Sequence, residues 1–234
     1  MQAIVICTKN AKCLPVLIAS IGFYVPEDVV VYISGSNIKV PGHKTINLKN
    51  NGTNFGDSYN EAMSAAFENH EEVVIANDDI VLTPYSWATL EKDVRLLQKK
   101  IKDVGYVAAR SDFARGVQNI RCGEGTLKFL RFESENSIVE QEIIAPIFAY
   151  IHRDNWINFP SVNWFSDDIQ CLDMAQLGLR HFVSVSYVHH VGSQTCGTDV
   201  KKCINDAKTW IALHRPDMFN NFFGENHEEE KATR

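Results

Sequence analysis

Two short acidic clusters are the side chains best suited to chemistry in this sequence. Asn77, Asp78 and Asp79 interrupt the apolar run VVIANDDIVLT, and Asp167 and Asp168 follow two aromatic residues in VNWFSDDIQCL. Adjacent carboxylates with an amide oxygen are hard ligands for Mg²⁺ or Mn²⁺, and such an ion can neutralise a diphosphate. The first cluster therefore predicts a divalent metal site, whereas the second offers a general base.

Both clusters also have a plain structural explanation. Asn-Asp-Asp is common turn chemistry, and acidic residues in the first turn of a helix are favoured by the helix dipole. The chain continues after Asp79 as the apolar run IVLTP and not as a hairpin, which favours a site over a simple turn. At Asp167 and Asp168, helix capping competes evenly with a general base beside Trp164, whose ring offers a surface for a sugar.

Further polar groups lie near the ends of other apolar runs. His189 and His190 end SYVHH, and one imidazole can complete a metal site begun by Asp79 or donate to a phosphate. The stretch NGTNFGDSYNEAMSAAF (51–67) has small and amide residues before a predicted helix, whose N-terminus favours anionic groups. It contains neither a dinucleotide-binding fingerprint nor a Walker loop.

Alternating strands and helices are predicted to position these residues. Continuous apolar, β-branched runs indicate strands covered on both faces, and apolar residues at helical spacing indicate the helices between them. Strands are predicted at 3–8, 28–35, 44–48, 72–77, 104–110, 143–153 and 180–190. Helices are predicted at 10–22, 57–70, 85–101, 166–178 and 199–213. The alternation predicts an α/β fold with a mixed, mostly parallel sheet flanked by helices.

Ligands of such a sheet bind at the carboxyl ends of its strands. Thr8 and Asn10 follow the first predicted strand, and Ser34 and Gly35 end the second. Hydroxyl, amide and small residues at these positions suit a sugar or a nucleotide. The stretch 112–142, by contrast, is polar and punctuated by glycine, which predicts hairpins or a mobile flap.

The composition limits the class of protein. The chain has 234 residues, of which 45% are hydrophobic, and this predicts one compact domain over 1–224. A net charge of −6 and a pI of about 5.7 exclude a global field that attracts nucleic acid or an anionic membrane. Six cysteines without a CxxC pair suit a reducing cytosol, and no apolar run approaches the length of a membrane helix. We therefore expect a soluble, cytoplasmic protein with a disordered tail at 225–234.

Taken in chain order, these motifs resemble a known family. Thr8 and Asn10, then NFGDSYNEA, ANDDIVLTP, FSDDIQCLDMAQLG and HVGSQT, are similar to nucleotide-sugar glycosyltransferases of the GT-A fold, in particular the inverting family 2. The resemblance spans about residues 3–195. It implies a Rossmann-like sheet with a nucleotide-binding half at about 1–110 and an acceptor half at about 111–224. In place of the acidic residue that many members use to bind the nucleotide, this chain has SGSN, so the nucleotide is not specified.

The resemblance implies a role for each motif. Asp79, Asp78 and Asn77 would bind the Mn²⁺ or Mg²⁺ that holds the donor diphosphate, with Asp79 the most dependable ligand and Asn77 in place of the usual first aspartate. His190 is preferred to His189 as a further metal ligand or phosphate contact.

Catalytic, donor and acceptor residues follow from the same match. Asp168 is the preferred catalytic base and Asp167 an acceptor contact, although the reverse assignment also fits. The donor-binding residues are Thr8, Asn10, Ser34, Gly35, Asn54, Gly56, Asn60 and His189. The acceptor-binding residues are Trp156, Trp164 and Asp167.

The implied activity is metal-dependent, inverting transfer of one hexosyl or pentosyl group from a nucleoside-diphosphate sugar to an acceptor hydroxyl. The acceptor would be a glycan, a lipid-linked sugar or a hydroxymethylated base in viral DNA. The DNA variant would place the protein in a host cytoplasm and would require a basic path. The candidates for that path are Lys99, Lys100, Lys102, Arg110, Arg115, Arg121, Lys128 and Arg131.

Two other classes of protein compete with this one. A nucleotidyltransferase also uses acidic metal ligands on an α/β sheet, but it usually needs a glycine-rich loop after the first strand, and CTKNAKCLP contains no glycine. A non-catalytic module that binds a nucleotide sugar would use the acidic clusters only as caps and turns.

Overall fold

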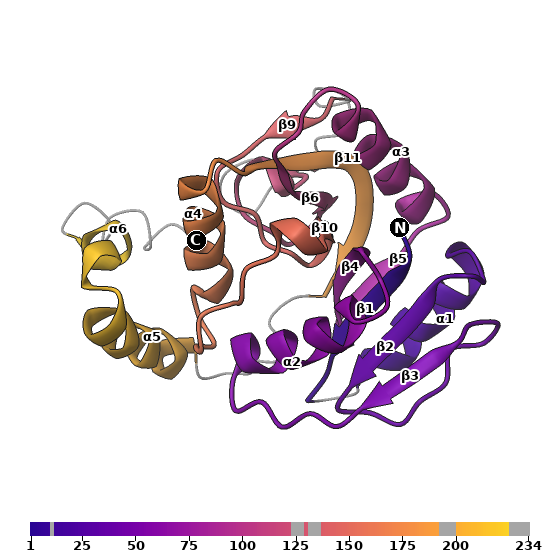
Figure 1. Ribbon diagram of the computed structural model, residues 1–234, viewed down its shortest axis with the longest axis horizontal. Coiled ribbons are helices and arrows are strands. Elements are labelled where there is room, and N and C mark those ends of the chain that lie inside the picture. Colours follow the sequence, from indigo (N-terminus) through magenta and orange to yellow (C-terminus); the bar gives the residue numbers. More distant parts are fainter. Residues whose placement is uncertain (10–11, 123–128, 131–136, 192–199, 225–234) are drawn as a thin grey trace.

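The computed structural model describes residues 1–9, 12–122, 129–130, 137–191 and 200–224, and within them a nine-stranded sheet forms the centre of the molecule (Figure 1). Its strands are β1 (Ala3–Cys7), β2 (Val30–Ser34), β3 (Thr45–Leu48), β4 (Glu72–Asn77), β5 (Ile80–Leu82), β6 (Val104–Ser111), β9 (Val139–Glu140), β10 (Phe148–His152) and β11 (Arg180–His190). The strand order is β3-β2-β1-β4-β10-β6-β11-β5, with β9 paired to β11. The predicted tail at 225–234 lies outside the described residues.

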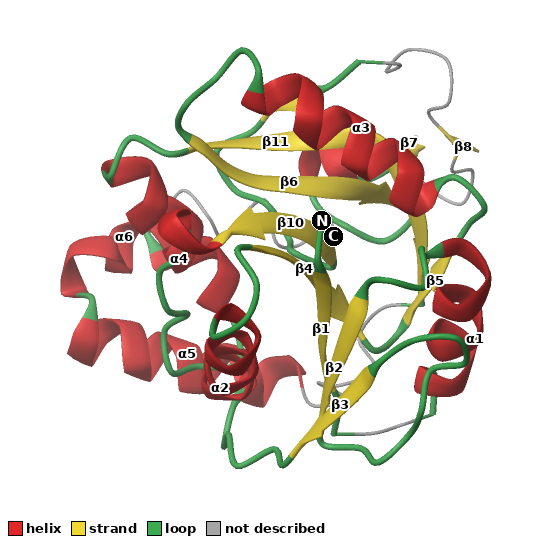
Figure 2. Ribbon diagram, turned by 45° about the vertical axis from the view of Figure 1, so that its right-hand side comes forward, coloured by secondary structure: helices red, strands yellow, loops and turns green. Residues whose placement is uncertain are grey.

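Helices cover both faces of this sheet. They are α1 (Leu14–Tyr24), α2 (Phe55–Phe67), α3 (Ser86–Gln98), α4 (Ser166–Gln176), α5 (Val200–His214) and α6 (Phe219–Phe223). Successive side chains of a strand point to opposite faces, so in β1 Ile4 and Ile6 pack with α1 and α3, whereas Ala3 and Val5 pack with α2 and α4. Figure 2 shows these two layers on either side of the strands.

A smaller apolar cluster attaches the last two helices to α4. Ile169 of α4 packs with Ile211 of α5, with Met218, and with Phe222 of α6. The start of α4, where the second acidic cluster lies, is therefore held from the sheet side and from the side of α5 and α6. No helix among the described residues is long and apolar enough to cross a membrane.

The carboxyl ends of three strands meet at one edge of the sheet. β1 is parallel to both of its neighbours, and Cys7 is in register with Ser34 of β2 and with Asn77 of β4. Beyond β4, β10 runs antiparallel to β4 and to β6, while β11 is parallel to β6. The mixed sheet with helices on both faces confirms the predicted α/β fold class.

Proline explains where two element boundaries differ from prediction. α1 begins later than expected and has Pro15 in its first turn, where a missing N–H breaks no helical hydrogen bond. β10 begins at Phe148 and not at 143, because Pro146 has no N–H to give to a ladder. The chain makes a tight turn there, with the N–H of Ile147 donating to the Ala145 carbonyl at 2.8 Å.

The first acidic cluster lies in a turn that is not a hairpin loop. β4 ends at Asn77 and β5 begins at Ile80, so Asp78 and Asp79 form the turn between them. β5 pairs with β11 and not with β4. In the stretch 112–142, β7 (Arg121–Cys122) and β8 (Phe129–Leu130) pair as a separate small sheet, as the prediction of hairpins anticipated.

Candidate functional site

Asp78 and Thr8 lie side by side where β4 and β1 end. The strands are parallel, with Cys7 in register with Asn77, so the residues that follow them emerge together. The Thr8 hydroxyl donates to Asp78 Oδ2 at 2.5 Å, and both side chains are buried. Burial raises the pKa of Asp78 to about 6, with the Thr8 hydrogen bond acting against the rise and the charge of Asp79 adding to it. A cation next to this carboxylate would favour its ionised form.

Asp79 faces His190 across the pairing of β5 with β11. His190 Nε2 lies 3.1 Å from Asp79 Oδ1, and both side chains are buried. His190 Nδ1 lies 2.7 Å from the carbonyl oxygen of Phe113, which can only accept, so Nδ1 carries a proton. Burial lowers the pKa of His190, but the hydrogen bond and the charge of Asp79 outweigh burial, and the net pKa is raised. Because Nδ1 donates to Phe113, Nε2 can donate to Asp79 only when the ring is protonated and positively charged.

A divalent cation between Asp79 and His190 would take the place of the proton that joins the two side chains. Neighbouring ligands of a six-coordinate ion with bonds of about 2.1 Å lie about 3.0 Å apart, close to the 3.1 Å between the two side-chain atoms. An imidazole that donates its other N–H to a carbonyl has the arrangement common to metal-binding histidines. Among the described residues, no group of three or more histidine, cysteine, aspartate or glutamate side chains is arranged to hold a metal. A cation here would need further ligands, such as diphosphate oxygens and water.

Asp112, which follows β6, holds both histidines. One carboxylate oxygen accepts the backbone N–H of His190 at 2.9 Å, and the other lies 2.8 Å from Nδ1 of His189. The Asp112 side chain is buried, whereas that of His189 is 50% exposed. Asp112 was not among the predicted site residues, although the rule that singled out Thr8, a polar residue after the carboxyl end of a strand, applies to it equally.

The second acidic cluster opens α4 in an uncommon backbone setting. Phe165, which precedes the helix, has a φ of 64°, in the left-handed region that non-glycine residues rarely enter. Its ring packs on Phe222 and Phe223, with ring centroids 4.9 and 5.6 Å away. Asp167 and Asp168 follow in the first helical turn, where the helix dipole favours negative charge.

Arg115 pairs with both carboxylates of this cluster. Its Nη1 contacts Asp168 Oδ1, and its Nη2 lies 3.3 Å from Asp167 Oδ2. Asp168 is 3% exposed, and its second oxygen, Oδ2, is buried with no hydrogen-bond partner among the described residues. Burial and the charge of Asp167 raise the pKa of Asp168, and Arg115 opposes them without cancelling them. Oδ2 is therefore the one carboxylate oxygen of Asp168 for which the described residues supply no hydrogen bond, and solvent does not reach it.

One loop joins the two acidic clusters. Among the residues that the structure describes, no hydrogen bond or ion pair links the first cluster or His190 directly to the second cluster. Asp112 contacts the histidines from one end of the segment 112–115, and Arg115 contacts the second cluster from the other. From the sequence, Arg115 was predicted only as part of a basic path for DNA, because no local pattern relates it to the two carboxylates.

Thr8, Ser34 and Gly35, three residues predicted to bind the donor, contact one another next to Asp78. The carbonyl of Ser34 accepts the N–H of Thr8 at 2.9 Å. Gly35 has a φ of +92°, and a Cβ at this position would lie 2.1 Å from the Thr8 carbonyl oxygen, so the close approach requires glycine. Asn10 lies outside the described residues.

Asn54, Gly56 and Asn60 join α2 to the loop that leads to α4. Asn54 caps α2 by accepting a backbone N–H of its first turn at 2.9 Å. Asn60 exchanges two hydrogen bonds with the backbone of Phe159, at 2.9 and 2.8 Å. A Cβ on Gly56 would lie 1.9 Å from the carbonyl oxygen of Pro160. These contacts hold the segment of chain that leads to the second acidic cluster against α2.

The two tryptophans predicted to bind the acceptor lie in different places. Trp164 stands edge-on to Phe165, with ring centroids 6.4 Å apart, directly before the second acidic cluster. Trp156 packs with Phe67 and Phe159 at 5.9 and 5.1 Å. Phe67 ends α2, so Trp156 is at the opposite end of that helix from its capped start.

Comparison with known proteins identifies the fold. No protein-family model matches the sequence, and no curated protein matches it. Among solved structures, S. aureus TarS 1–349 in complex with UDP-GlcNAc is similar, with a TM-score of 0.55 and 16% identity over 100% of this chain and 76% of that chain. The chain shares the α/β fold of this TarS structure. A second structure of TarS 1–349 has a TM-score of 0.49 and 15% identity over 98% of this chain and 77% of that chain.

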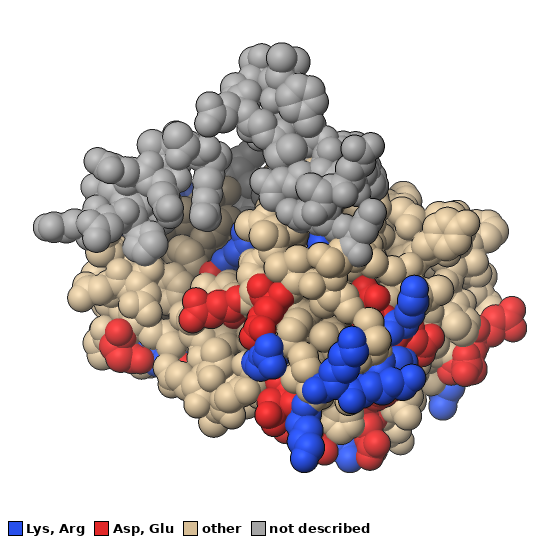
Figure 3. All heavy atoms as spheres, turned by 90° about the horizontal axis from the view of Figure 1, so that it is seen from above, with Lys and Arg blue, Asp and Glu red and all other residues tan. Residues whose placement is uncertain are grey.

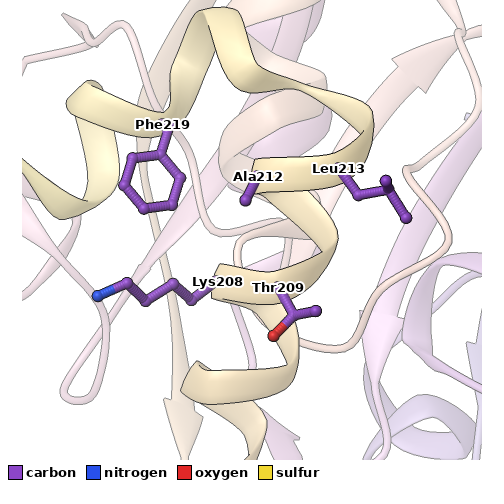
Figure 4. A pocket seen from close by; sticks show the side chains of 5 residues that line it. All are labelled: Lys208, Thr209, Ala212, Leu213 and Phe219. Atoms are coloured by element: carbon purple, nitrogen blue, oxygen red, sulfur yellow. The ribbon is translucent and has the colours of Figure 1, made fainter.

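An open groove with a volume of about 530 Å³ lies on α5 and α6 (Figure 4). It is lined by Lys208, Thr209, Ala212, Leu213 and Phe219. The ammonium of Lys208 lies 5.9 and 5.5 Å from the ring centroids of Phe219 and Phe223, so its charge sits over the aromatic surface. None of the predicted site residues lines this groove.

Two arginines of the expected basic path are engaged by protein groups. Arg110 is buried and donates to the carbonyls of Ser184 and Ser137, at 3.2 and 2.9 Å. Arg115 is paired with the second acidic cluster. Figure 3 shows one face of the molecule on which Lys and Arg side chains gather with Asp and Glu side chains among them. Lys128 and Arg131 lie outside the described residues.

Proposed function

We propose that this chain is a metal-dependent, inverting glycosyltransferase that moves one sugar from a nucleoside-diphosphate sugar to an acceptor hydroxyl. The observation that carries the proposal is the loop 112–115, which joins the Asp79–His190 pair to the buried Asp168 with its free Oδ2. Support for the donor class comes from the fold, because the similar structure of TarS is in complex with UDP-GlcNAc, a nucleotide sugar.

Asp79 and His190 would hold a Mn²⁺ or Mg²⁺ ion, with Asp78 and Asn77 beside them. When bound, this ion would neutralise the donor diphosphate and stabilise the departing nucleoside diphosphate. Two neighbouring residues orient His190 for this role. Phe113 sets which nitrogen of His190 faces Asp79, and Asp112 holds the His190 backbone in place.

Asp168 would act as the general base. Its Oδ2 takes the proton of an acceptor hydroxyl, and the acceptor oxygen bonds to the anomeric carbon as the bond from that carbon to the diphosphate oxygen breaks. This single displacement inverts the anomeric configuration and needs no covalent intermediate. Asp167 and Trp164, next to the base, would contact the acceptor, with the indole offering an apolar face to a sugar ring.

A thermal-shift screen tests this proposal. The protein is heated with a panel of nucleotide sugars that includes UDP-GlcNAc, and with nucleoside triphosphates, once with Mn²⁺ and once with EDTA. A donor at 100 times its Kd stabilises the native state by about 2.7 kcal/mol, which raises the Tm of a chain of this size by about 5–10 °C. We expect a shift that requires Mn²⁺. If no nucleotide sugar gives a shift, the proposal is wrong, and a shift given only by nucleoside triphosphates would instead indicate a nucleotidyltransferase.

A further inference from the structure

Arg115 lies in a loop that hydrogen bonds hold against the sheet. The loop ends in a one-turn 3₁₀ helix, in which the N–H of Gln118 donates to the Arg115 carbonyl at 3.2 Å. The Gln118 side chain is fully buried, and its amide donates to the carbonyls of Ala109 and Ala145 at 2.9 and 2.8 Å. Its amide oxygen accepts the N–H of Ala145 at 3.0 Å. The backbone that presents Arg115 is therefore fixed to β6 and to the segment before β10.

Negative groups outnumber positive groups in the contacts that Arg115 makes with the second acidic cluster. Asp167 and Asp168 share the guanidinium of Arg115. The thiol of Cys171, one turn further along α4, is another titratable group that interacts electrostatically with all three. A carboxylate as deeply buried as Asp168 is protonated unless a positive charge stabilises it, and a protonated carboxyl cannot take a proton. Arginine supplies such a charge at every working pH because its guanidinium does not deprotonate.

We propose that Arg115 is the positioning residue of the candidate base: its guanidinium keeps Asp168 ionised, occupies Oδ1 and leaves Oδ2 for the acceptor hydroxyl. This inference rests on the proposed function, in which Asp168 takes the proton. Two carboxylates on one guanidinium carry a net negative charge, so Asp168 keeps its affinity for a proton instead of being locked in a neutral ion pair.

A purely structural role for Arg115 would have a different pH signature. Burial raises the pKa of Asp168 to about 7, against about 3.9 in an unfolded chain. The native state then binds more protons than the unfolded state between about pH 4 and pH 7, so stability falls as pH rises through that window. Without Arg115 the native pKa rises further, and the fall in stability extends to higher pH. If Arg115 only packed the loop against α4, its replacement would lower the stability by the same amount at every pH.

The test is the Tm of variants between pH 5 and pH 8.5, measured without metal or nucleotide. We expect the Tm of Arg115→Met to fall relative to wild type by at least about 5 °C as pH rises from 5 to 8. Arg115→Lys should recover most of that loss, because it restores a positive charge. In an Asp168→Asn background the same change at Arg115 should cost an amount that does not vary with pH, whereas in an Asp167→Asn background the pH dependence should persist.

A Tm loss from Arg115→Met that is equal at every pH, or that keeps its pH dependence in the Asp168→Asn background, would overturn the inference. If Arg115→Met does not fold at all, Arg115→Gln, which also removes the charge but keeps a polar side chain, takes its place in the same comparison with and without Asp168→Asn. Because no donor enters the experiment, its outcome is separate from that of the thermal-shift screen. If the screen detects donor binding but the Tm loss of Arg115→Met does not depend on pH, only the role of Arg115 is contradicted. If the Tm loss depends on pH but the screen detects no donor, only the proposed function is contradicted.

Discussion

Asp112 and Arg115 lie at the two ends of one short segment and contact the two halves of the candidate site. Asp112 accepts the N–H of His190 at 2.9 Å, and Arg115 Nη2 lies 3.3 Å from Asp167 Oδ2. A loop anchored through the buried Gln118 thus sets the separation between the Asp79–His190 pair and the carboxylates of α4. Correct spacing of metal and base is a requirement of a reaction in which one group leaves as the other attacks.

Replacement of Asp79 by asparagine should abolish metal-dependent donor binding and preserve the fold. The amide keeps the shape of the side chain but supplies no negative charge to a cation. We expect the affinity for Mn²⁺, measured by isothermal titration calorimetry, to fall at least about tenfold. Asp173→Asn is the matched control, because Asp173 pairs with Arg215 at 2.8 Å and belongs to neither cluster. Unchanged Mn²⁺ affinity in Asp79→Asn would place the metal elsewhere.

The change Asp112→Asn should weaken Mn²⁺ binding indirectly. Asparagine offers one acceptor oxygen, whereas Asp112 uses both of its oxygens, on the His190 backbone and on the His189 ring. Loss of such a supporting carboxylate typically lowers metal affinity about 10–100-fold. Asp93→Asn serves as the control, since Asp93 is also buried and holds β11, but through Ser184 and Val185. Equal losses in the two variants would mean that Asp112 supports only the fold.

Turnover should depend on pH through Asp168. A general base must be ionised, and burial together with the charge of Asp167 raises the pKa of Asp168 to about 7. The rate should therefore fall about tenfold per unit of pH below about 7. Asp167→Asn removes the neighbouring negative charge, so the acidic limb of the profile should move to lower pH. A limb that stays in place in this variant would indicate that another group titrates.

Gly35 should tolerate substitution worse than another glycine of similar backbone conformation. Gly35 and Gly178 have φ values of +92° and +86°, but a Cβ on Gly35 would lie 2.1 Å from the Thr8 carbonyl, whereas one on Gly178 would meet nothing within 4 Å. Gly178→Ala should cost about 1–2 kcal/mol in urea denaturation from the backbone strain alone. Gly35→Ala should cost more, because Thr8 must also move. Equal costs would show that this contact is not tight.

Much of the fold was predictable because its signals are local. The apolar, β-branched runs at 3–8 and 72–77 show in the sequence that they form buried strands, and the rule about strand ends singled out Thr8 and Asp78. The register of β1 with β2 and β4 explains why the rule worked here, since it brings the residues after these strands to one edge of the sheet.

The partners of the second acidic cluster were not predictable in the same way. Arg115 and Asp168 are 53 positions apart, and Arg115 belongs to a polar stretch in which no periodic pattern marks a site. The pairing of Asp79 with His190 likewise depends on β5 joining β11, and β5 is too short for its sequence to reveal a strand or its neighbour. The donor-binding roles of Asn54, Gly56 and Asn60 remain predictions, since the structure shows what these residues contact within the protein.

The most direct test of the proposed function compares binding with turnover in Asp168→Asn. Wild type and variant are incubated with Mn²⁺ and the nucleotide sugar that gives the largest thermal shift. Water then serves as the acceptor hydroxyl, and the resulting release of nucleoside diphosphate is followed. We predict that Asp168→Asn keeps its affinity for the donor and releases nucleoside diphosphate about 10²–10⁴ times more slowly than wild type. Release at the wild-type rate by Asp168→Asn would contradict the assignment of Asp168 as the base of a glycosyltransferase.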